Sequence, residues 1–78
     1  MIRLLYFAIL RERLGKQEEM LEFSGSIGEL RKLLIEREPH LADVLKVCLF
    51  AVNQEYVGED FVLKGGETVA VIPPVSGG

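Results

Sequence analysis

The sequence has 78 residues, which is enough for one small domain and too few for two independent cores. Hydrophobic residues make up 49% of it and charged residues 27%, proportions that exclude disorder over most of the chain. Its net charge is −3 and its basic residues are scattered, so we expect no nucleic-acid binding. No apolar run approaches the ~20 residues of a membrane span, and the N-terminus lacks signal-peptide features. We therefore expect a cytoplasmic protein that does not bind membranes.

The first third of the chain switches from a strand pattern to a helix pattern and back. Residues 2–7 are short, apolar and β-favouring, which predicts a largely buried strand. Residues 8–14 are good helix formers, and Gly15 can close that short helix. Loose alternation over residues 17–23 predicts a second strand.

The main helix is predicted by its ends as well as by its apolar periodicity. Ser26 and Glu29 form a capping-box pattern just before an apolar-periodic run. Pro39 disfavours helical geometry at Glu38, so we expect the helix to stop there. Apolar spacing over residues 41–45 allows a further short helix.

The remaining chain is predicted to form strands and turns. Residues 48–52 form one strand, residues 56–57 a short one, and residues 53–55 suit a tight hairpin connection. The last strand covers residues 68–72 and is stopped by two prolines. The order of strand, short helix, strand, long helix and three strands predicts an α+β fold. We expect a mixed sheet of four to five strands with one main helix packed on one face.

The titratable side chains give little sign of catalysis. Glu18, Glu19 and Glu22 are interpreted as a solvated strand face. His40 stands at a predicted helix start and is interpreted as a surface or capping residue. Cys48 lies in an apolar run and is interpreted as a buried small hydrophobe; being the single cysteine, it forms no internal disulfide or metal cage. Without a P-loop or a paired nucleophile and base, we expect no catalytic machinery and no metal site in this chain.

The last six residues form a distinct segment after the predicted domain of residues 1–72. Its sequence is Pro73, Pro74, Val75, Ser76, Gly77 and Gly78. The two prolines stiffen the exit from the sheet, and six residues reach roughly 20 Å, enough to enter a partner's cleft. The two glycines fit a narrow channel. The alternative is a frayed terminus without a role. A terminal carboxylate is a poor electrophile, so an active tail needs a second protein to activate it.

Three segments resemble one known family. They are residues 63–78 with the Pro-Pro-Val-Ser-Gly-Gly ending, residues 7–15 with the short helix, and residues 51–53 before the hairpin. On these segments the chain resembles the small subunits of molybdopterin synthase, which are ubiquitin-like β-grasp sulfur carriers with a flexible C-terminal tail. Two positions depart from the family pattern. Gly65-Gly66-Glu67 stands where an Asp is usual, and Ile72 where an aromatic residue is common.

The resemblance implies a specific chemistry for Gly78. A separate ATP-dependent adenylyltransferase would convert its carboxylate to an acyl-adenylate, and a sulfur-donor protein would supply the sulfur of a thiocarboxylate. The large synthase subunit would bind the tail and transfer the sulfur to cyclic pyranopterin monophosphate, in molybdenum cofactor biosynthesis. The resemblance also implies a heterotetramer in which this chain binds no cofactor and residues 73–77 thread the partner's channel.

A docking surface is predicted on the first strand. Alternation places Arg3, Leu5 and Phe7 on one face, and a charged Arg3 is disfavoured under a helix, so this face is expected to be open. Leu5 and Phe7 would then be exposed apolar groups, and Ile72 could join them from the last strand. The resemblance implies that the large subunit docks on this face.

Three alternatives stay open. One is a sulfur carrier of the same fold from another pathway, such as thiamine thiazole formation; those chains usually lack a helix between the first two strands. Another is a protein modifier that forms isopeptide bonds through Gly78. The third is a plain interaction module with an idle tail.

Overall fold

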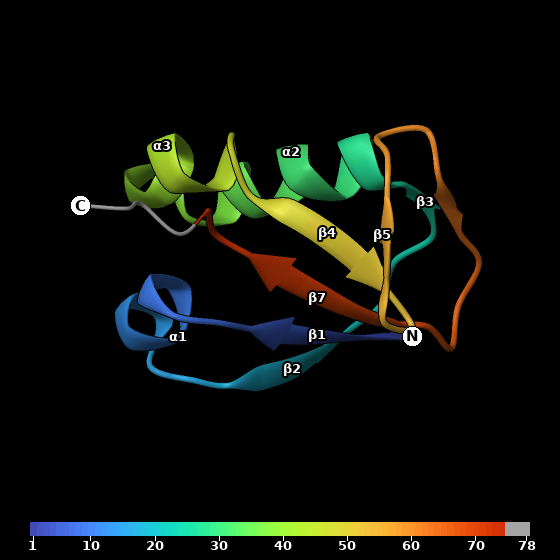
Figure 1. Ribbon diagram of the computed structural model, residues 1–78, viewed down its shortest axis with the longest axis horizontal. Helices are drawn as coiled ribbons and strands as arrows, with labels where there is room; N and C mark the ends of the chain where they lie inside the picture. Colours follow the sequence, from blue (N-terminus) through green and yellow to red (C-terminus); the bar gives the residue numbers. More distant parts are fainter. Residues whose placement is uncertain (75–78) are drawn as a thin grey trace.

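The computed structural model describes residues 1–74, which form one larger and one smaller sheet with helices packed against them (Figure 1). The elements in chain order are β1 (Ile2–Tyr6), α1 (Ile9–Leu14), β2 (Glu18–Leu21), β3 (Gly25–Ser26), α2 (Ile27–Arg37), the 3₁₀-helix η1 (Pro39–Leu41), α3 (Ala42–Leu45), β4 (Leu49–Val52), β5 (Glu55–Val57), β6 (Val62–Leu63) and β7 (Thr68–Ile72).

The larger sheet has the strand order β2-β1-β7-β4-β5. Its two middle strands β1 and β7 run parallel, while the pairs β1–β2, β4–β7 and β4–β5 are antiparallel. The helix α2 packs along one face of this sheet (Figure 1). These observations confirm the predicted α+β class, the mixed sheet and the single main helix. The last strand, β7, lies at the centre of the sheet.

The core lies between the sheet and the helices. Successive side chains of a strand point to opposite faces, so each strand contributes alternate residues to this layer. The buried apolar residues of the core are Ile2, Leu4, Tyr6, Leu10, Ile27, Leu30, Leu34, Leu41, Leu45, Cys48, Phe50, Val52, Leu63, Val69 and Val71. No part of the chain that the structure describes contains a helix long and apolar enough to cross a membrane.

The predicted ends of α2 are confirmed. The Glu29 backbone N–H donates to the Ser26 hydroxyl at 3.1 Å, and the Ser26 backbone N–H donates to the Glu29 carboxylate at 2.8 Å. At the other end the Glu38 N–H donates to the Leu34 carbonyl at 2.9 Å, directly before Pro39. The short helix α1 also ends as predicted, because Gly15 adopts the left-handed conformation with φ of 72°.

The expectation of three strands after the main helix is wrong, because four follow it within residues 1–74. The additional strand β6 pairs antiparallel with β3 in a sheet of its own, with Gly25 opposite Leu63 and Ser26 opposite Val62. Each of these strands has two residues, too few to show a period in the sequence.

A single arginine on α2 joins the helix layer to the loops around it. The Arg31 guanidinium donates to the carbonyl oxygens of Leu45 and Cys48 at 2.7 and 2.9 Å. It also pairs with both carboxylate oxygens of Glu59, at 2.6 and 3.0 Å, and lies 4.8 Å from the ring centre of Phe50. Arg31 therefore connects α2 to the end of α3, to β4 and to the loop before β6.

Candidate functional site

The face of the sheet opposite α2 is open, as the alternation in β1 predicts. Ile2 and Leu4 are fully buried on the helix side, and Tyr6 is 3% exposed. Leu5 is half-buried and Phe7 is 43% exposed on the other side. The predicted division of β1 into a core row and an open row is confirmed.

The strand register places Ile72 on this open face beside the β1 residues. Leu5 lies opposite Ala70 in the parallel pair of β1 and β7, and Ile72 follows Ala70 by one full alternation. On the other side of β7, Leu49 and Ala51 of β4 lie opposite Ile72 and Ala70. We call this group the apolar patch; its residues are Leu5, Phe7, Leu49, Ala51, Ala70 and Ile72.

Three members of the apolar patch, Leu49, Ala51 and Ala70, were missed by the sequence reasoning. Leu49 is 54% exposed, while the small Ala51 side chain is only 6% exposed. Tyr56, which lies opposite Ala51 in the β4–β5 pair and is 69% exposed, borders the patch. Alternation over residues 48–52 was the available signal for the two β4 residues, because it places Leu49 and Ala51 on the face opposite the core residues Cys48, Phe50 and Val52.

A shallow groove of about 440 Å³ runs over part of the patch, where it is lined by Leu5, Phe7, Ala51 and Ala70. Its apolar floor is bordered at one end by Asn53, Gln54 and Thr68. The Asn53 side-chain oxygen accepts a hydrogen bond from the Thr68 N–H at 3.1 Å, and the Asn53 N–H donates to the Thr68 carbonyl at 2.9 Å. Asn53 and Gln54 form the tight turn between β4 and β5 with positive φ angles of 49° and 75°. The uncharged polar end of the groove is thereby fixed to the start of β7.

An ion pair lies at the other margin of the open face. Arg3 Nε is 2.8 Å from Glu18 Oε2, and a second hydrogen bond of 3.1 Å joins the same two side chains. The hydrogen bond from Arg3 lowers the pKa of Glu18. Both side chains are about half exposed, so this pair contributes little to stability.

The two prolines at the start of the tail differ in burial. Pro73 is buried and Pro74 is exposed. The other predicted tail residues lie outside the described residues: Val75, Ser76, Gly77 and Gly78.

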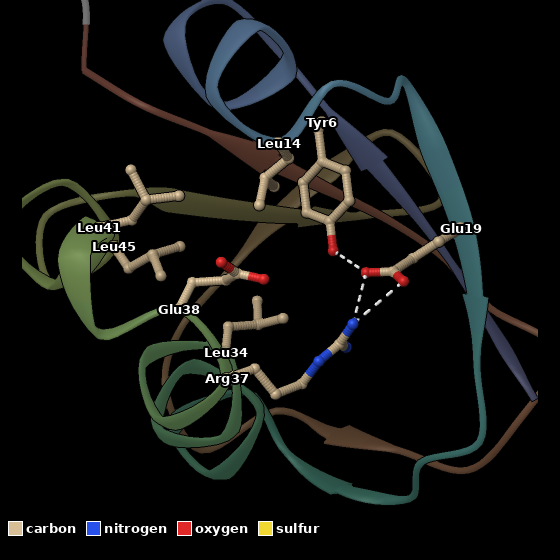
Figure 2. A pocket seen from close by; sticks show the side chains of 8 residues that line it. All are labelled: Tyr6, Leu14, Glu19, Leu34, Arg37, Glu38, Leu41 and Leu45. Atoms are coloured by element: carbon tan, nitrogen blue, oxygen red, sulfur yellow. Dashed lines mark hydrogen bonds and ion pairs between the residues drawn. The ribbon is translucent and has the colours of Figure 1, made fainter.

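An enclosed cavity on the helix side is drawn in Figure 2, and it is small. Its volume is about 10 Å³, close to the least space that holds one water molecule. The side chains that line it are Tyr6, Leu14, Glu19, Leu34, Arg37, Glu38, Leu41 and Leu45. A cavity of this size does not admit a substrate.

The interpretation of Glu19 as part of a solvated strand face is wrong. Figure 2 shows its carboxylate pointing under the sheet edge, where the Tyr6 hydroxyl and the Arg37 guanidinium donate to it. Lys16 Nζ donates to the same carboxylate at 2.9 Å. The charge is therefore neutralised by partners on β1, α2 and the loop after α1. An inward-pointing charge on an edge strand such as β2 also disfavours pairing with another sheet.

The pKa shifts in this cluster have structural causes. Burial raises the pKa of Glu19, but the hydrogen bonds from its three partners outweigh burial and leave the pKa below its usual value. Burial is the largest cause that raises the pKa of Tyr6, and the hydrogen bond to Glu19 raises it further. Within residues 1–74, no buried side-chain nitrogen or oxygen lacks a hydrogen-bond partner. We interpret the cluster as a structural network between β1, β2 and α2.

The other two titratable side chains singled out in the sequence stand apart from both the patch and this network. Cys48 is 1% exposed, its thiol donates to the Val44 carbonyl at 3.2 Å, and burial raises its pKa to about 11. It is therefore a poor thiolate nucleophile. His40 is exposed on η1, 3.7 Å from the Glu38 carboxylate. Across the described part of the chain, no three His, Cys, Asp or Glu side chains are grouped so as to hold a metal ion.

Comparison with known proteins gives the family. The profile of the ThiS family matches residues 4–78, which include most of the first strand, the apolar patch and the Gly-Gly ending. The chain belongs to the ThiS family. The resemblance to β-grasp sulfur carriers is thereby confirmed, and so is the ubiquitin-like form of the α+β fold.

Named relatives of this ThiS-family chain align over nearly its whole length. The molybdopterin synthase sulfur carrier subunit of Chlamydomonas reinhardtii is 43% identical, with 99% of this chain and 98% of the relative covered. The protein of that name from Homo sapiens is 43% identical, covering 99% and 93%. Among solved structures, a complex of subunits 1 and 2 of the molybdopterin-converting factor from Helicobacter pylori contains a chain with a TM-score of 0.72. It is 27% identical to this chain and the match covers 99% and 97% of the two chains.

Proposed function

We propose that this chain is the sulfur carrier subunit of a molybdopterin synthase. One geometric observation supports the proposal most directly: β7 carries part of the apolar patch and continues into the Pro-Pro-Val-Ser-Gly-Gly segment. A partner docked on the patch therefore holds the strand from which the tail starts. The curated relatives that carry this name align over the same full length.

Gly78 is the reacting residue in this proposal. An ATP-dependent adenylyltransferase joins the carboxylate oxygen of Gly78 to the α-phosphorus of ATP and releases pyrophosphate. A donor protein then supplies sulfur at the oxidation level of sulfide. This sulfur forms a bond to the Gly78 carbonyl carbon and AMP leaves, which gives a thiocarboxylate. Unlike the carboxylate, the thiocarboxylate is a sulfur nucleophile at neutral pH, and Gly77 gives the end of the chain the slender form that a narrow channel needs.

The large synthase subunit is the proposed recipient of the tail. It docks on the apolar patch through Phe7, Leu5 and Ile72. Residues 74–77 thread its channel, because Pro73, expected from the sequence to belong to the threading segment, is buried in the domain. There the sulfur is transferred to cyclic pyranopterin monophosphate. The described residues offer no nucleophile with an activating base, so the acid–base groups belong to the partner. We place the assembly, a heterotetramer, in the cytoplasm, with no cofactor bound by this chain.

The helix α1 favours this pathway over the thiazole pathway of thiamine synthesis. It occupies Ile9–Leu14 between β1 and β2, where thiazole carriers usually turn directly from strand to strand. A modifier role depends on the same tail, and no feature of the described surface favours it.

Mass spectrometry of the reconstituted reaction tests the proposal. The purified chain is incubated with the adenylyltransferase, ATP and a sulfur donor. The expected product is heavier by the mass difference between sulfur and oxygen, and tandem fragmentation places the change on Gly78. Transfer of that sulfur to the pterin precursor in the presence of the large subunit completes the test. A thiocarboxylate that forms but transfers sulfur only to a thiazole-forming enzyme would contradict the pathway, and isopeptide attachment to other proteins would support the modifier.

A further inference from the structure

The tail follows directly on the central strand of the sheet. The central strand β7 is paired with β1 from Arg3–Thr68 to Tyr6–Val71 and with β4 up to Leu49–Ile72. A strand that is hydrogen-bonded on both sides has little freedom to shift or tilt. The position at which the chain leaves the sheet is therefore set by β4 at Ile72 and by β1 one residue earlier, at Val71.

Pro73 continues the core row of β7 by one residue. Val69 and Val71 are fully buried on the helix side, Ala70 and Ile72 face the open side, and Pro73 is again buried. Pro74 is exposed. Proline has no backbone N–H. Its ring can therefore pack against the core at the point where strand pairing ends, and no buried donor is left without a partner.

From this contrast we infer that Pro73 is a positioning residue for the sulfur-transfer reaction. Its buried ring holds the backbone in place, and the ring closure fixes φ near −65°, so the folded domain sets the direction of the following residues. The segment proposed to enter a partner therefore begins at Pro74. Five residues reach roughly 15–17 Å, which shortens the reach expected for the whole six-residue segment.

This inference rests on the proposed function, because it assigns Pro73 a role in delivering Gly78. The simpler interpretation is that Pro73 only fills space at the end of the core. The two interpretations differ in what a substitution changes. A space-filling residue affects the melting temperature alone, whereas a positioning residue also affects transfer within a complex that is already formed.

A matched pair of substitutions separates these effects. Pro73→Ser removes the φ restraint and the apolar anchor, whereas Pro74→Ser makes the same chemical change at the exposed neighbour. Pro73→Val restores an apolar side chain at the anchor without the ring. Each variant is first converted to the thiocarboxylate and checked by mass, then mixed with saturating large subunit below its melting temperature. The single-turnover rate of sulfur transfer is measured together with the affinity for the large subunit.

We expect Pro74→Ser to slow transfer about two- to five-fold, the effect of one lost φ restraint. Pro73→Ser is expected to be slower by a further five- to thirty-fold, the effect of leaving one more residue to be ordered. Pro73→Val should recover most of that second loss, and all three variants should bind the large subunit within about two-fold of wild type. Equal rates for Pro73→Ser and Pro74→Ser, with only the melting temperature lowered, would overturn the inference. Absence of transfer from wild-type thiocarboxylate would contradict the proposed function instead.

Discussion

Leu5 of β1 lies directly opposite Ala70 of β7 on the open face of the sheet, in a parallel register. This pairing puts the docking residues of the first strand beside the strand that carries the tail, although 65 positions separate them in the sequence. A partner that covers Leu5 therefore also covers the base of the tail. Recognition of the domain and delivery of Gly78 are coupled by a single strand pair.

Phe7→Ala is expected to weaken binding of the large subunit by about 1–3 kcal/mol, the scale of losing an aromatic anchor. Phe7 is 43% exposed in the free domain, so its removal leaves the fold intact. Phe61→Ala is a matched control, because Phe61 is 41% exposed but lies before β6, away from the apolar patch. Calorimetric titration of both variants against the large subunit measures the difference. Equal losses for the two would place the interface elsewhere.

Deleting Gly78 is expected to abolish sulfur transfer while the melting temperature stays within a few degrees of wild type. Adding one residue after Gly78 should abolish transfer as well, because the reacting group must be the last carboxylate of the chain. Thermal unfolding and product formation, measured on the same preparations, check both variants. Activity that survives an uncleaved C-terminal extension would contradict a carrier role.

The features predicted from the sequence are those that depend on residues close together in the chain. Alternation in β1 separated Phe7 from Tyr6, and the capping box of Ser26 and Glu29 marked the start of α2. The role of the tail stays a prediction from its residue types, two prolines that stiffen the chain and two glycines that keep its end slender, and residues 75–78 lie outside the described residues. Local periodicity and backbone chemistry therefore determine these features without knowledge of the tertiary fold.

The features that were missed depend on partners far apart in sequence. Glu19 looked solvated because its partner Arg37 lies 18 residues away, on another element. Arg31 fitted the polar face of α2, yet it bonds to carbonyl groups 14 to 17 residues further on. Pro73 is buried and Pro74 is exposed because of packing at the end of the sheet. Two identical neighbouring residues give no sign of this difference in the sequence.

Arg31→Met is expected to destabilise the domain by about 2–4 kcal/mol, because carbonyl groups at the end of α3 and the start of β4 lose their donor. Methionine keeps an unbranched apolar stem over Phe50, so the loss reports mainly on hydrogen bonding. Glu59→Gln, at the 55% exposed end of the same ion pair, should cost less than about 1 kcal/mol. Urea unfolding of both variants measures the two values. Similar losses would show that the ion pair, rather than the carbonyl contacts, supplies the stability.

Ala8→Gly is expected to stabilise the domain. Ala8 has φ of 53° and ψ of −127°, a conformation that favours glycine, in the turn closed by the hydrogen bond from the Leu10 N–H to the Phe7 carbonyl. Glycine relieves about 1–3 kcal/mol of backbone strain in the folded state. It also adds conformational entropy to the unfolded chain, which costs roughly 0.5–1 kcal/mol. The free energy of unfolding should therefore rise by about 0.5–2 kcal/mol. Ala42→Gly, where φ is −54°, is the control and should destabilise. A lower melting temperature for Ala8→Gly would show that the turn is unstrained.

The domain is expected to become less stable at acidic pH because Glu19 is protonated there. Burial raises its pKa, but the stronger effect of its hydrogen bonds leaves the folded pKa below the usual value of 4.5. The stabilisation from the charged carboxylate is therefore complete above that usual value and is lost as the pH falls through the lower, folded pKa. Arg37 and Lys16 then face a neutral acid in place of a carboxylate.

Glu19→Gln tests this dependence by removing the titrating group while keeping its shape. At pH 7 the variant should be less stable by about 1–2 kcal/mol, because Gln offers one oxygen where two charged ones accept hydrogen bonds. As the pH falls below 4.5, wild type should lose this advantage and the two curves should converge. Glu18→Gln is the control, since its pairing with Arg3 is exposed to solvent and should change stability little. Urea unfolding between pH 7 and pH 3 measures the curves, and a difference that stays constant over that range would show that Glu19 acts through packing rather than charge.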